Sequence, residues 1–324
     1  MIFRRHKMME KKKLALTMTL ITLAAVTFSC ILIQLFTPDT SPLPGPDYGE
    51  REEGRRGLCY NALNAAEVEA LSGSQVRWLY NWHYECSPEE DALFMEADLD
   101  YVPMAWGAQW DEEAMRAYYG RHPGARYLLG YNEPNMGEDF GGCFMTPAEA
   151  ARDWERLERV AEDFGLELVS PALTYSGVTL SDGKLYGSPR EWMDAFIEEY
   201  KALHGGRAPR YDYLAIHSYM NWPQAVEGFC REYYGIYGKR IWLTEFCAWE
   251  FDNGPQIESM RAQTDSMKEK LLFLDRWEGI FRYSWFMSHG ATDTVPYNSV
   301  FVRKGGDGTL TSLGKEYLGW TGED

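Results

Sequence analysis

Hydrophobic and polar residues follow a repeating pattern along the chain, in which short apolar runs are separated by longer amphipathic segments. Eight of the runs have the length and the aromatic or branched side chains of buried strands. The segments between them place apolar residues at helical spacing, so the pattern predicts strands that alternate with helices. The predicted strands are residues 57–60, 76–80, 101–105, 126–131, 167–170, 211–216, 240–244 and 281–286.

Three of the helical segments open with the same start signal. In Ser87–Glu90, Thr146–Glu149 and Ser188–Glu191, a hydroxyl residue precedes a proline and is followed three positions later by glutamate. The hydroxyl and the glutamate can cap each other's free backbone N–H groups, and proline is tolerated at the first helical position. Eight strand–helix units joined by right-handed crossovers predict an α/β fold with a parallel sheet, and favour its closure into a (β/α)8 TIM barrel.

The first 56 residues have a different pattern. Residues 14–36 contain no charged side chain, and a helix of that length, at about 1.5 Å per residue, can cross a bilayer. Residues 1–13 carry six basic side chains, which predicts a cytoplasmic tail and an exported body. Residues 37–56 are rich in proline and charge and predict a linker. We therefore expect a transmembrane signal anchor that holds residues 57–324 at the membrane, outside the cytoplasm; the alternative is a cleaved signal peptide and a secreted domain.

Composition excludes several classes of protein. The net charge of −17 argues against a nucleic-acid partner, because an acidic surface repels phosphates. The cysteines form no CxxC pair, so we expect no zinc site. No glycine-rich nucleotide fingerprint follows a predicted strand. Aromatic residues make up 15% of the chain, which leaves rings beyond those needed for a core and suits a carbohydrate cleft.

Two carboxylates stand at equivalent positions, each directly after a predicted strand. Glu133 follows the run 126–131, and Glu245 follows the run 240–244. Ligands bind at the carboxyl ends of parallel strands, so we expect the two side chains to meet there. Two carboxylates among amides and aromatic rings predict glycoside hydrolysis, in which one acid protonates the leaving oxygen and the other carboxylate attacks or stabilises the anomeric carbon. The amides, rings and imidazole that follow strands include Asn81, Trp82, Trp106, Asn132, His217, Tyr219, Trp249 and Trp285.

Several motifs, in order and spacing, resemble those of glycoside hydrolase family 128, the β-1,3-glucanases of clan A. The resemblance covers residues 57–320 and leaves out the anchor and the linker. It implies a (β/α)8 fold, an endo-β-1,3-glucanase that cleaves with retention, and neither a metal nor an organic cofactor. The motifs are Gly57-Leu-Cys-Tyr-Asn61, Trp78-Leu-Tyr-Asn-Trp82, Gly130-Tyr-Asn-Glu-Pro134, His217-Ser-Tyr219, Trp242-Leu-Thr-Glu245 and Tyr283-Ser-Trp-Phe286.

The same resemblance, carried over position by position, implies roles for the site residues. Glu133 would be the general acid/base and Glu245 the nucleophile. Asn132 would bond a sugar hydroxyl, while His217 and Tyr219 would line the cleft and orient Glu245. The other substrate-binding positions would be Trp82 and Trp285, as walls that stack on sugars, together with Asn81, Trp106 and Trp249.

A retaining mechanism makes two physical demands on the carboxylates. Their carboxyl groups should lie about 5–5.5 Å apart. Glu133 should have a raised pKa, because it must be protonated near neutral pH to act as an acid. We expect a monomer that binds β-1,3-glucan. Two alternatives remain open: a non-catalytic β-glucan-binding surface module, and a clan A hydrolase of another polysaccharide such as mannan, cellulose or xylan.

Overall fold

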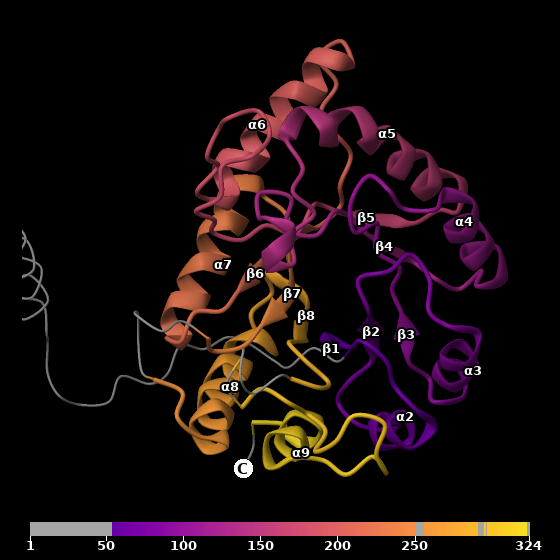
Figure 1. Cartoon of the computed structure of the whole chain (residues 1–324), viewed down its shortest axis with the longest axis vertical. Coiled ribbons are helices and arrows are strands. Elements are labelled where there is room, and N and C mark those ends of the chain that lie inside the picture. The colour runs from indigo at the N-terminus through magenta and orange to yellow at the C-terminus, as the bar shows by residue number, and fades with distance from the viewer. Residues whose placement is uncertain (1–53, 250–255, 291–294, 296, 323–324) are drawn as a thin grey trace, which may run out of the picture. The chain divides into compact units, whose positions relative to one another are not determined.

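The computed structural model describes residues 54–249, 256–290, 295 and 297–322, and each of the eight predicted strands is present among them (Figure 1). The strands are β1 (Arg56–Cys59), β2 (Trp78–Tyr80), β3 (Asp100–Tyr101), β4 (Tyr127–Leu129), β5 (Glu167–Val169), β6 (Leu214–Ser218), β7 (Ile241–Phe246) and β8 (Ile280–Trp285). The helices are α2 (Ala65–Leu71), α3 (Pro88–Glu96), α4 (Glu112–Arg121), α5 (Pro147–Asp163), α6 (Pro189–Leu203), α7 (Pro223–Tyr237), α8 (Met260–Leu274) and α9 (Ser312–Gly319), with a 3-10 turn, η1 (Glu138–Phe140), after β4.

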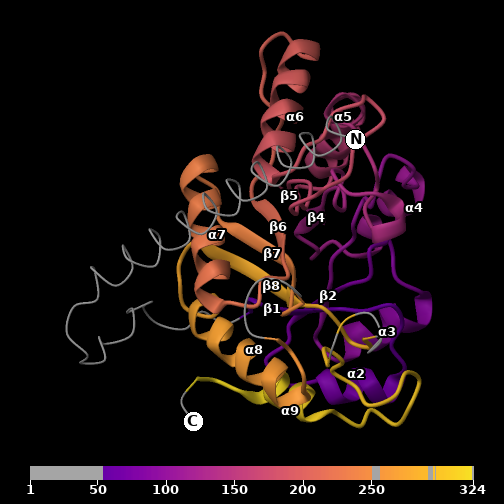
Figure 2. The same cartoon turned by 60° about the vertical axis from the view of Figure 1, so that its left-hand side comes forward.

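All pairings among these eight strands are parallel. Six strands form one sheet in the order β3-β2-β1-β8-β7-β6, and β4 pairs with β5 in a second sheet. Single parallel bridges join the two sheets, from Met104 to Leu129 on one side and from Val169 to Tyr213 on the other. In Figures 1 and 2 the helices lie around the outside of the strands. The α/β class and the parallel strands predicted from the sequence are confirmed.

Side chains alternate between two buried faces of the strands. Leu58 and Leu79 belong to the large cluster that includes the buried helix residues, whereas Cys59 and Tyr80, their neighbours in the chain, belong to a smaller cluster with Trp78. This alternation is the period of two that a strand imposes on its side chains. The smaller cluster therefore marks the face that lies away from the helices, and residues at the ends of that face can reach a common site.

The predicted helix starts are confirmed. The side chains of Ser87, Thr146 and Ser188 each accept a hydrogen bond from the backbone three residues later, and the glutamate at that position caps in return. A reciprocal cap of the same type, known as a capping box and formed by Asn64 and Glu67, begins α2. These caps fix where the helices begin and hence the lengths of the loops that follow the strands.

The folded domain begins slightly before the predicted boundary at residue 57. Arg56, which the proline and charge content of residues 37–56 placed in the linker, is the first residue of β1 and is buried. Its guanidinium lies 2.7 Å from Asp275 and donates to the Tyr283 hydroxyl, so the buried charge is paired. The predicted anchor at residues 14–36 lies outside the described residues. Within the described part of the chain, no helix combines the length and apolarity needed to cross a membrane.

Candidate active site

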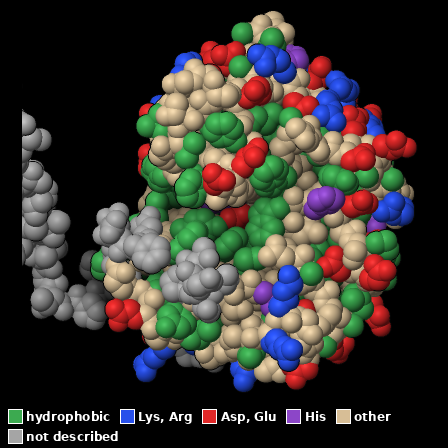
Figure 3. All heavy atoms as spheres, in the orientation of Figure 1, with side chains coloured by type: hydrophobic (Ala, Val, Ile, Leu, Met, Phe, Trp, Pro, Cys, Tyr) green, Lys and Arg blue, Asp and Glu red, His purple; other side chains and the backbone are tan. Residues whose placement is uncertain are grey.

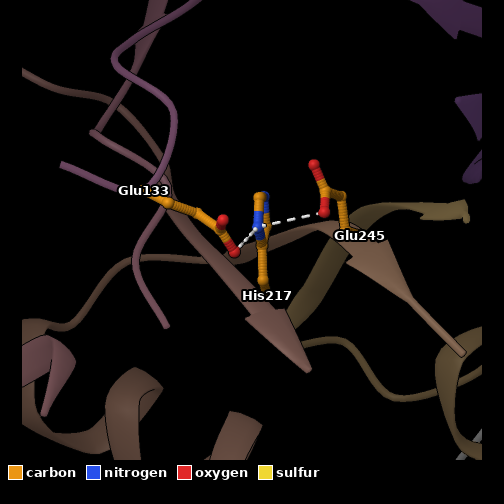
Figure 4. Close-up of side chains that lie close together, drawn as sticks. All are labelled: Glu133, His217 and Glu245. Carbon is orange, nitrogen blue, oxygen red and sulfur yellow. Dashed lines mark hydrogen bonds and ion pairs between the residues drawn. The ribbon is translucent and has the colours of Figure 1, made fainter. Parts of the chain in front are cut away.

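Three buried ionisable side chains from different elements meet in the structure (Figure 4). Glu133 follows β4, His217 lies in β6 and Glu245 lies in β7. The His217 Nδ1 atom is 2.8 Å from Glu133 Oε1 and 3.3 Å from Glu245 Oε2. Their exposed fractions are 6% for Glu133, 1% for His217 and 3% for Glu245. Glu133 and Glu245, which the sequence analysis expects to meet at the strand ends, are thus linked through one imidazole.

A register shift between β6 and β7 brings Glu245 to this site. Ile216 pairs with Leu243, but the next residue, His217, pairs with Glu245, so Thr244 is skipped. Regular alternation from Trp242 would turn Thr244, rather than Glu245, to the inner face. The extra residue resets the alternation, as a β-bulge does, and aims the carboxylate inward.

Glu133 is held by an unusual backbone conformation. Its φ angle is +43°, in the left-handed region that few residues other than glycine adopt. The backbone N–H of Glu133 donates to the Ala172 carbonyl at 2.8 Å, and its carbonyl accepts from the Met136 N–H at 2.9 Å. Such strained residues persist where the surroundings fix them, and they cluster at functional sites.

Three neutral donors surround the carboxylate of Glu245. The Trp82 indole N–H donates to Oε1 at 2.7 Å, and the Tyr80 hydroxyl lies 3.2 Å from the same oxygen. The Tyr219 hydroxyl donates to Oε2. A buried negative charge is costly unless it is hydrogen-bonded, and donors to a charged acceptor are the stronger kind. Glu245 is therefore a buried carboxylate whose charge is stabilised on both oxygens.

Glu133 has a different electrostatic environment. Burial raises the pKa of Glu133, the charge of Glu245 raises it further, and His217 opposes both effects. Burial lowers the pKa of His217, but the two carboxylates outweigh this and raise it overall. Glu133 can thus keep its proton at a pH where an exposed glutamate is ionised. Two carboxylates whose environments differ in this way suit an acid and a nucleophile.

The distance between the carboxylates restricts the chemistry. One oxygen of Glu133 lies within 4.8 Å of one oxygen of Glu245. The carboxyl groups of inverting glycosidases are separated by roughly 6.5–9.5 Å to leave room for a water molecule, and those of retaining enzymes by about 5–5.5 Å, so an approach of two oxygens this close favours the retaining arrangement. Among the described residues, the same trio is also the one cluster of His, Cys, Asp and Glu side chains with metal-like spacing, and the Nδ1 atom there is already engaged with both carboxylates.

An aromatic cleft of about 750 Å³ adjoins the carboxylates. Trp82, whose N–H reaches Glu245, forms part of its wall together with Trp106. Figure 3 shows a hollow at the centre of this face, with acidic atoms at its bottom and hydrophobic side chains around it. Flat rings beside a pair of carboxylates are suited to holding sugars. Further rings that line the cleft are Tyr84, Trp110 and Phe144.

The other expected substrate-binding residues differ in their surroundings. Asn132 is buried beside Glu133; its Nδ2 donates to the Gly141 carbonyl at 3.0 Å, while its Oδ1 has no hydrogen-bond partner among the described residues. Trp249 packs edge-on against Tyr219, with 5.4 Å between ring centroids. The Asn81 Oδ1 accepts from the Tyr101 hydroxyl at 2.6 Å and from the backbone N–H of His83, so this oxygen fixes the loop after β2.

The structure corrects the expectation for Trp285. Its exposed fraction is 0%, its indole N–H donates to the Asn298 carbonyl at 2.8 Å, and its ring packs against Phe246. A ring with no exposed face cannot stack on a sugar. The next residue, Phe286, is partly exposed and contacts both Trp82 and Tyr219 edge-on, at centroid distances of 5.9 and 5.6 Å. Strand alternation thus puts the site ring one residue later than expected.

Tyr80 is a site residue that the strand-end pattern does not single out, because it lies within β2. The available signal is its spacing from Trp78: residues two apart in a strand face the same side, and both rings belong to the inner cluster. Tyr80 is fully buried beneath Trp82, with 5.4 Å between the ring centroids. Its hydroxyl thus reaches Glu245 from the inner face of β2.

Comparison with solved structures identifies enzymes of similar fold. An endo-β-1,3-glucanase of glycoside hydrolase family 128, subgroup II, from Pseudomonas viridiflava is 36% identical, with a TM-score of 0.71; the match covers 82% of this chain and 97% of that one. A subgroup II endo-β-1,3-glucanase from Sorangium cellulosum is 29% identical, with a TM-score of 0.68 and coverage of 83% and 100%.

Sequence comparison agrees with these structures. Among curated proteins, Alkali-sensitive linkage protein 1 of Schizosaccharomyces pombe is 23% identical over 277 residues, which is 82% of this chain; the chain spans 44% of the length of that relative. The family model described as the glycosyl hydrolase catalytic core matches residues 57–317. With that match and 36% identity across almost all of the Pseudomonas enzyme, the chain belongs to the glycosyl hydrolase catalytic-core family and, within it, to glycoside hydrolase family 128.

Proposed function

We propose that this glycoside hydrolase is an endo-β-1,3-glucanase that cleaves with retention, with Glu133 as acid/base and Glu245 as nucleophile. The observation that supports this most strongly is the buried pair of carboxylates joined by His217, with oxygens within 4.8 Å of each other. That separation fits direct attack by a carboxylate. The substrate follows from the two subgroup II enzymes, both of which are endo-β-1,3-glucanases.

The proposal includes closure of the eight strands into a (β/α)8 barrel. Bridges at Met104–Leu129 and Val169–Tyr213 support it, because they connect the two sheets on both sides of β4–β5. A closed barrel gathers the carboxyl ends of all strands at one rim. Glu133 after β4 and Glu245 in β7 would then face each other across that rim.

In the first step, an oxygen of Glu245 attacks the anomeric carbon while Glu133 gives its proton to the glycosidic oxygen. The bond between the anomeric carbon and that oxygen breaks, and the sugar becomes an ester of Glu245. The raised pKa of Glu133 supports this assignment, since it keeps the proton available. The donors on Glu245 support the other role, because they orient a carboxylate that must be ionised to attack.

In the second step, the loss of charge on Glu245 changes the role of Glu133. The negative charge of Glu245 helps to raise the pKa of Glu133, so forming the ester lowers that pKa. Glu133 then accepts a proton from water as the water oxygen bonds to the anomeric carbon. The ester bond breaks, Glu245 returns as a carboxylate, and two inversions leave the configuration unchanged.

The remaining site residues would bind the sugar. The unpartnered Oδ1 of Asn132 can accept a hydrogen bond from a sugar hydroxyl beside the reacting carbon. Trp82, Trp106 and Phe286 are partly exposed rings suited to stacking. Trp249 would act through its contact with Tyr219. The His217 Nδ1 atom lies close to both carboxylates, 2.8 Å from Glu133 and 3.3 Å from Glu245, so we assign His217 a role in positioning both.

We also propose that residues 14–36 anchor the enzyme in a membrane, with the catalytic domain outside the cytoplasm. The uncharged stretch and its basic flank support this. Fractionation of cells that produce the full chain would test it. Recovery in the membrane fraction, with the domain accessible to added protease, is expected. A soluble product whose N-terminus lies beyond residue 36 would favour cleavage instead.

The proposed activity is tested by incubating the full chain with laminarin and a panel of β-1,4-glucan, mannan and xylan. Endo-cleavage of laminarin should release oligosaccharides of mixed length early in the reaction. Glu133→Gln and Glu245→Gln should each lose about a hundredfold or more of the rate, whereas Glu69→Gln, an exposed control on α2, should retain it. Faster cleavage of another polysaccharide would contradict the substrate, and full activity of Glu245→Gln would contradict the nucleophile.

A further inference from the structure

The Tyr80 hydroxyl has two acceptors on consecutive residues of β7. It lies 3.0 Å from the Thr244 carbonyl oxygen and 3.2 Å from Glu245 Oε1. A tyrosine hydroxyl carries one proton, so it can make one full hydrogen bond at a time or share the proton between both acceptors. The side chain is fully buried, which confines the hydroxyl to these partners and to Cys59.

Cys59 of β1 completes a small buried network around Tyr80. Its sulfur lies 3.4 Å from the Tyr80 hydroxyl oxygen, 3.4 Å from the Thr244 carbonyl and 3.2 Å from the Ser284 hydroxyl. Burial raises the pKa of both Cys59 and Tyr80 well above their ordinary values. Both groups therefore stay neutral, and the Tyr80 proton is shared through hydrogen bonds but is not released.

We propose that Tyr80 is a positioning residue whose hydroxyl moves its hydrogen bond between Glu245 and the Thr244 carbonyl as the charge on Glu245 changes. This inference rests on the proposed function. In the free enzyme Glu245 is a carboxylate and the stronger acceptor, since hydrogen bonds to charged groups are about twice as strong as neutral ones. In the glycosyl ester that advantage is lost, and the Tyr80 hydroxyl donates its hydrogen bond to the Thr244 carbonyl instead. The proton stays on the Tyr80 oxygen throughout.

The consequence is a bias toward the second step of catalysis. Hydrolysis of the ester regenerates the negative charge on Glu245, and the Tyr80 donor stabilises that charge as it appears. In the first step the same donor stabilises the carboxylate before it attacks, which does not favour attack. Loss of the hydroxyl should therefore slow breakdown of the ester more than its formation.

The test compares full-chain Tyr80→Phe with wild type on 2,4-dinitrophenyl β-laminaribioside, whose activated leaving group makes formation of the ester fast. We expect kcat to fall about tenfold or more, kcat/KM to change less, and the ester to accumulate as an adduct in intact-protein mass spectra. Tyr119→Phe is the matched control, because Tyr119 is also buried and its hydroxyl donates to a backbone carbonyl, that of Tyr127, at 2.7 Å.

A second variant probes the network without altering Tyr80. Cys59→Ala removes a weak donor from the Tyr80 oxygen, so we expect the same accumulation of adduct to a smaller extent. Accumulation in neither Tyr80→Phe nor Cys59→Ala, or equal losses of kcat and kcat/KM as for a general packing defect, would overturn the inference. Labelling of wild type with 2-deoxy-2-fluoro-β-laminaribiosyl fluoride distinguishes a failure of the Tyr80 inference from a failure of the proposed function. Label on Glu245 supports the proposed function, and its absence from Glu245 would overturn both.

Discussion

Replacing Glu245 with glutamine tests the electrostatic coupling on which the two-step mechanism depends. Burial raises the pKa of Glu133, and the charge of Glu245 adds to the effect. Oxygens of the two carboxylates lie within 4.8 Å, and at an effective dielectric constant of about 20 two unit charges at that distance repel by about 3.5 kcal/mol. Glutamine keeps the shape of the side chain and removes this repulsion. We therefore expect the pKa of Glu133 to be lower in Glu245→Gln than in wild type.

The assay is a carbon-13 NMR titration of protein labelled at the glutamate side-chain carboxyl carbon. The Glu133 signal is assigned by its loss from the double variant Glu133→Gln/Glu245→Gln. The pKa of His217 is also raised by Glu245, so its imidazole proton signals should titrate at lower pH in Glu245→Gln. The matched control Glu69→Gln removes an exposed carboxylate on α2 and should leave the Glu133 titration unchanged.

The proposed coupling would be wrong if the Glu133 titration stayed in place, or moved to higher pH, when residue 245 is neutral. Burial and His217 alone would then set the proton affinity of Glu133. In that case forming the ester could not convert Glu133 from an acid into a base. The exchange of roles in the second step would need another cause.

Three further substitutions test separate parts of the account. Glu133→Gln should raise the free energy of unfolding at neutral pH, because a carboxyl with a raised folded-state pKa costs about 1.4 kcal/mol per pKa unit once it is ionised. The gain should grow as the pH rises from about 4.3 through the folded-state pKa of Glu133, and urea unfolding that shows no such growth would count against the raised pKa. His217→Gln should move the basic limb of the kcat/KM profile to higher pH, because the imidazole lowers the pKa of Glu133; a limb that stays or moves lower would contradict this. Trp82→Phe should lower kcat on 2,4-dinitrophenyl β-laminaribioside, where breakdown of the ester limits the rate, about tenfold at an unchanged melting temperature, since an aromatic ring is kept but the N–H donor to Glu245 is lost; wild-type kcat would show that this donor is dispensable.

The sequence predicts the elements of this fold well because its local signals are strong. Apolar runs of strand length locate all eight strands, and the capping boxes at Ser87, Thr146 and Ser188 locate three helix starts. Local signals are weaker at boundaries. The proline and charge content of residues 37–56 assigned Arg56 to the linker, whereas a partner more than two hundred residues away, Asp275, allows it to be buried in β1.

The candidate site is predicted in part, and the misses have a common cause. Glu133 and Glu245 follow apolar runs, so their convergence could be expected from parallel topology. Whether a side chain at a strand end faces the site depends on register, which a single sequence does not display. Trp285 therefore falls on the buried side and Phe286 on the open side. Tyr80 lies within a strand, and its hydrogen bond to Glu245 depends on the shifted pairing of β7.

In the proposed mechanism, two adjacent carboxylates cleave β-1,3-glucan through an ester of Glu245. Such an ester requires net retention, and proton NMR of the first products released from laminarihexaose by the full chain can detect retention because the anomeric signals are read before mutarotation. We expect the β-anomer of the new reducing end to appear first and the α-anomer to follow slowly. Initial release of the α-anomer would show inversion and would contradict the assignment of Glu245 as nucleophile.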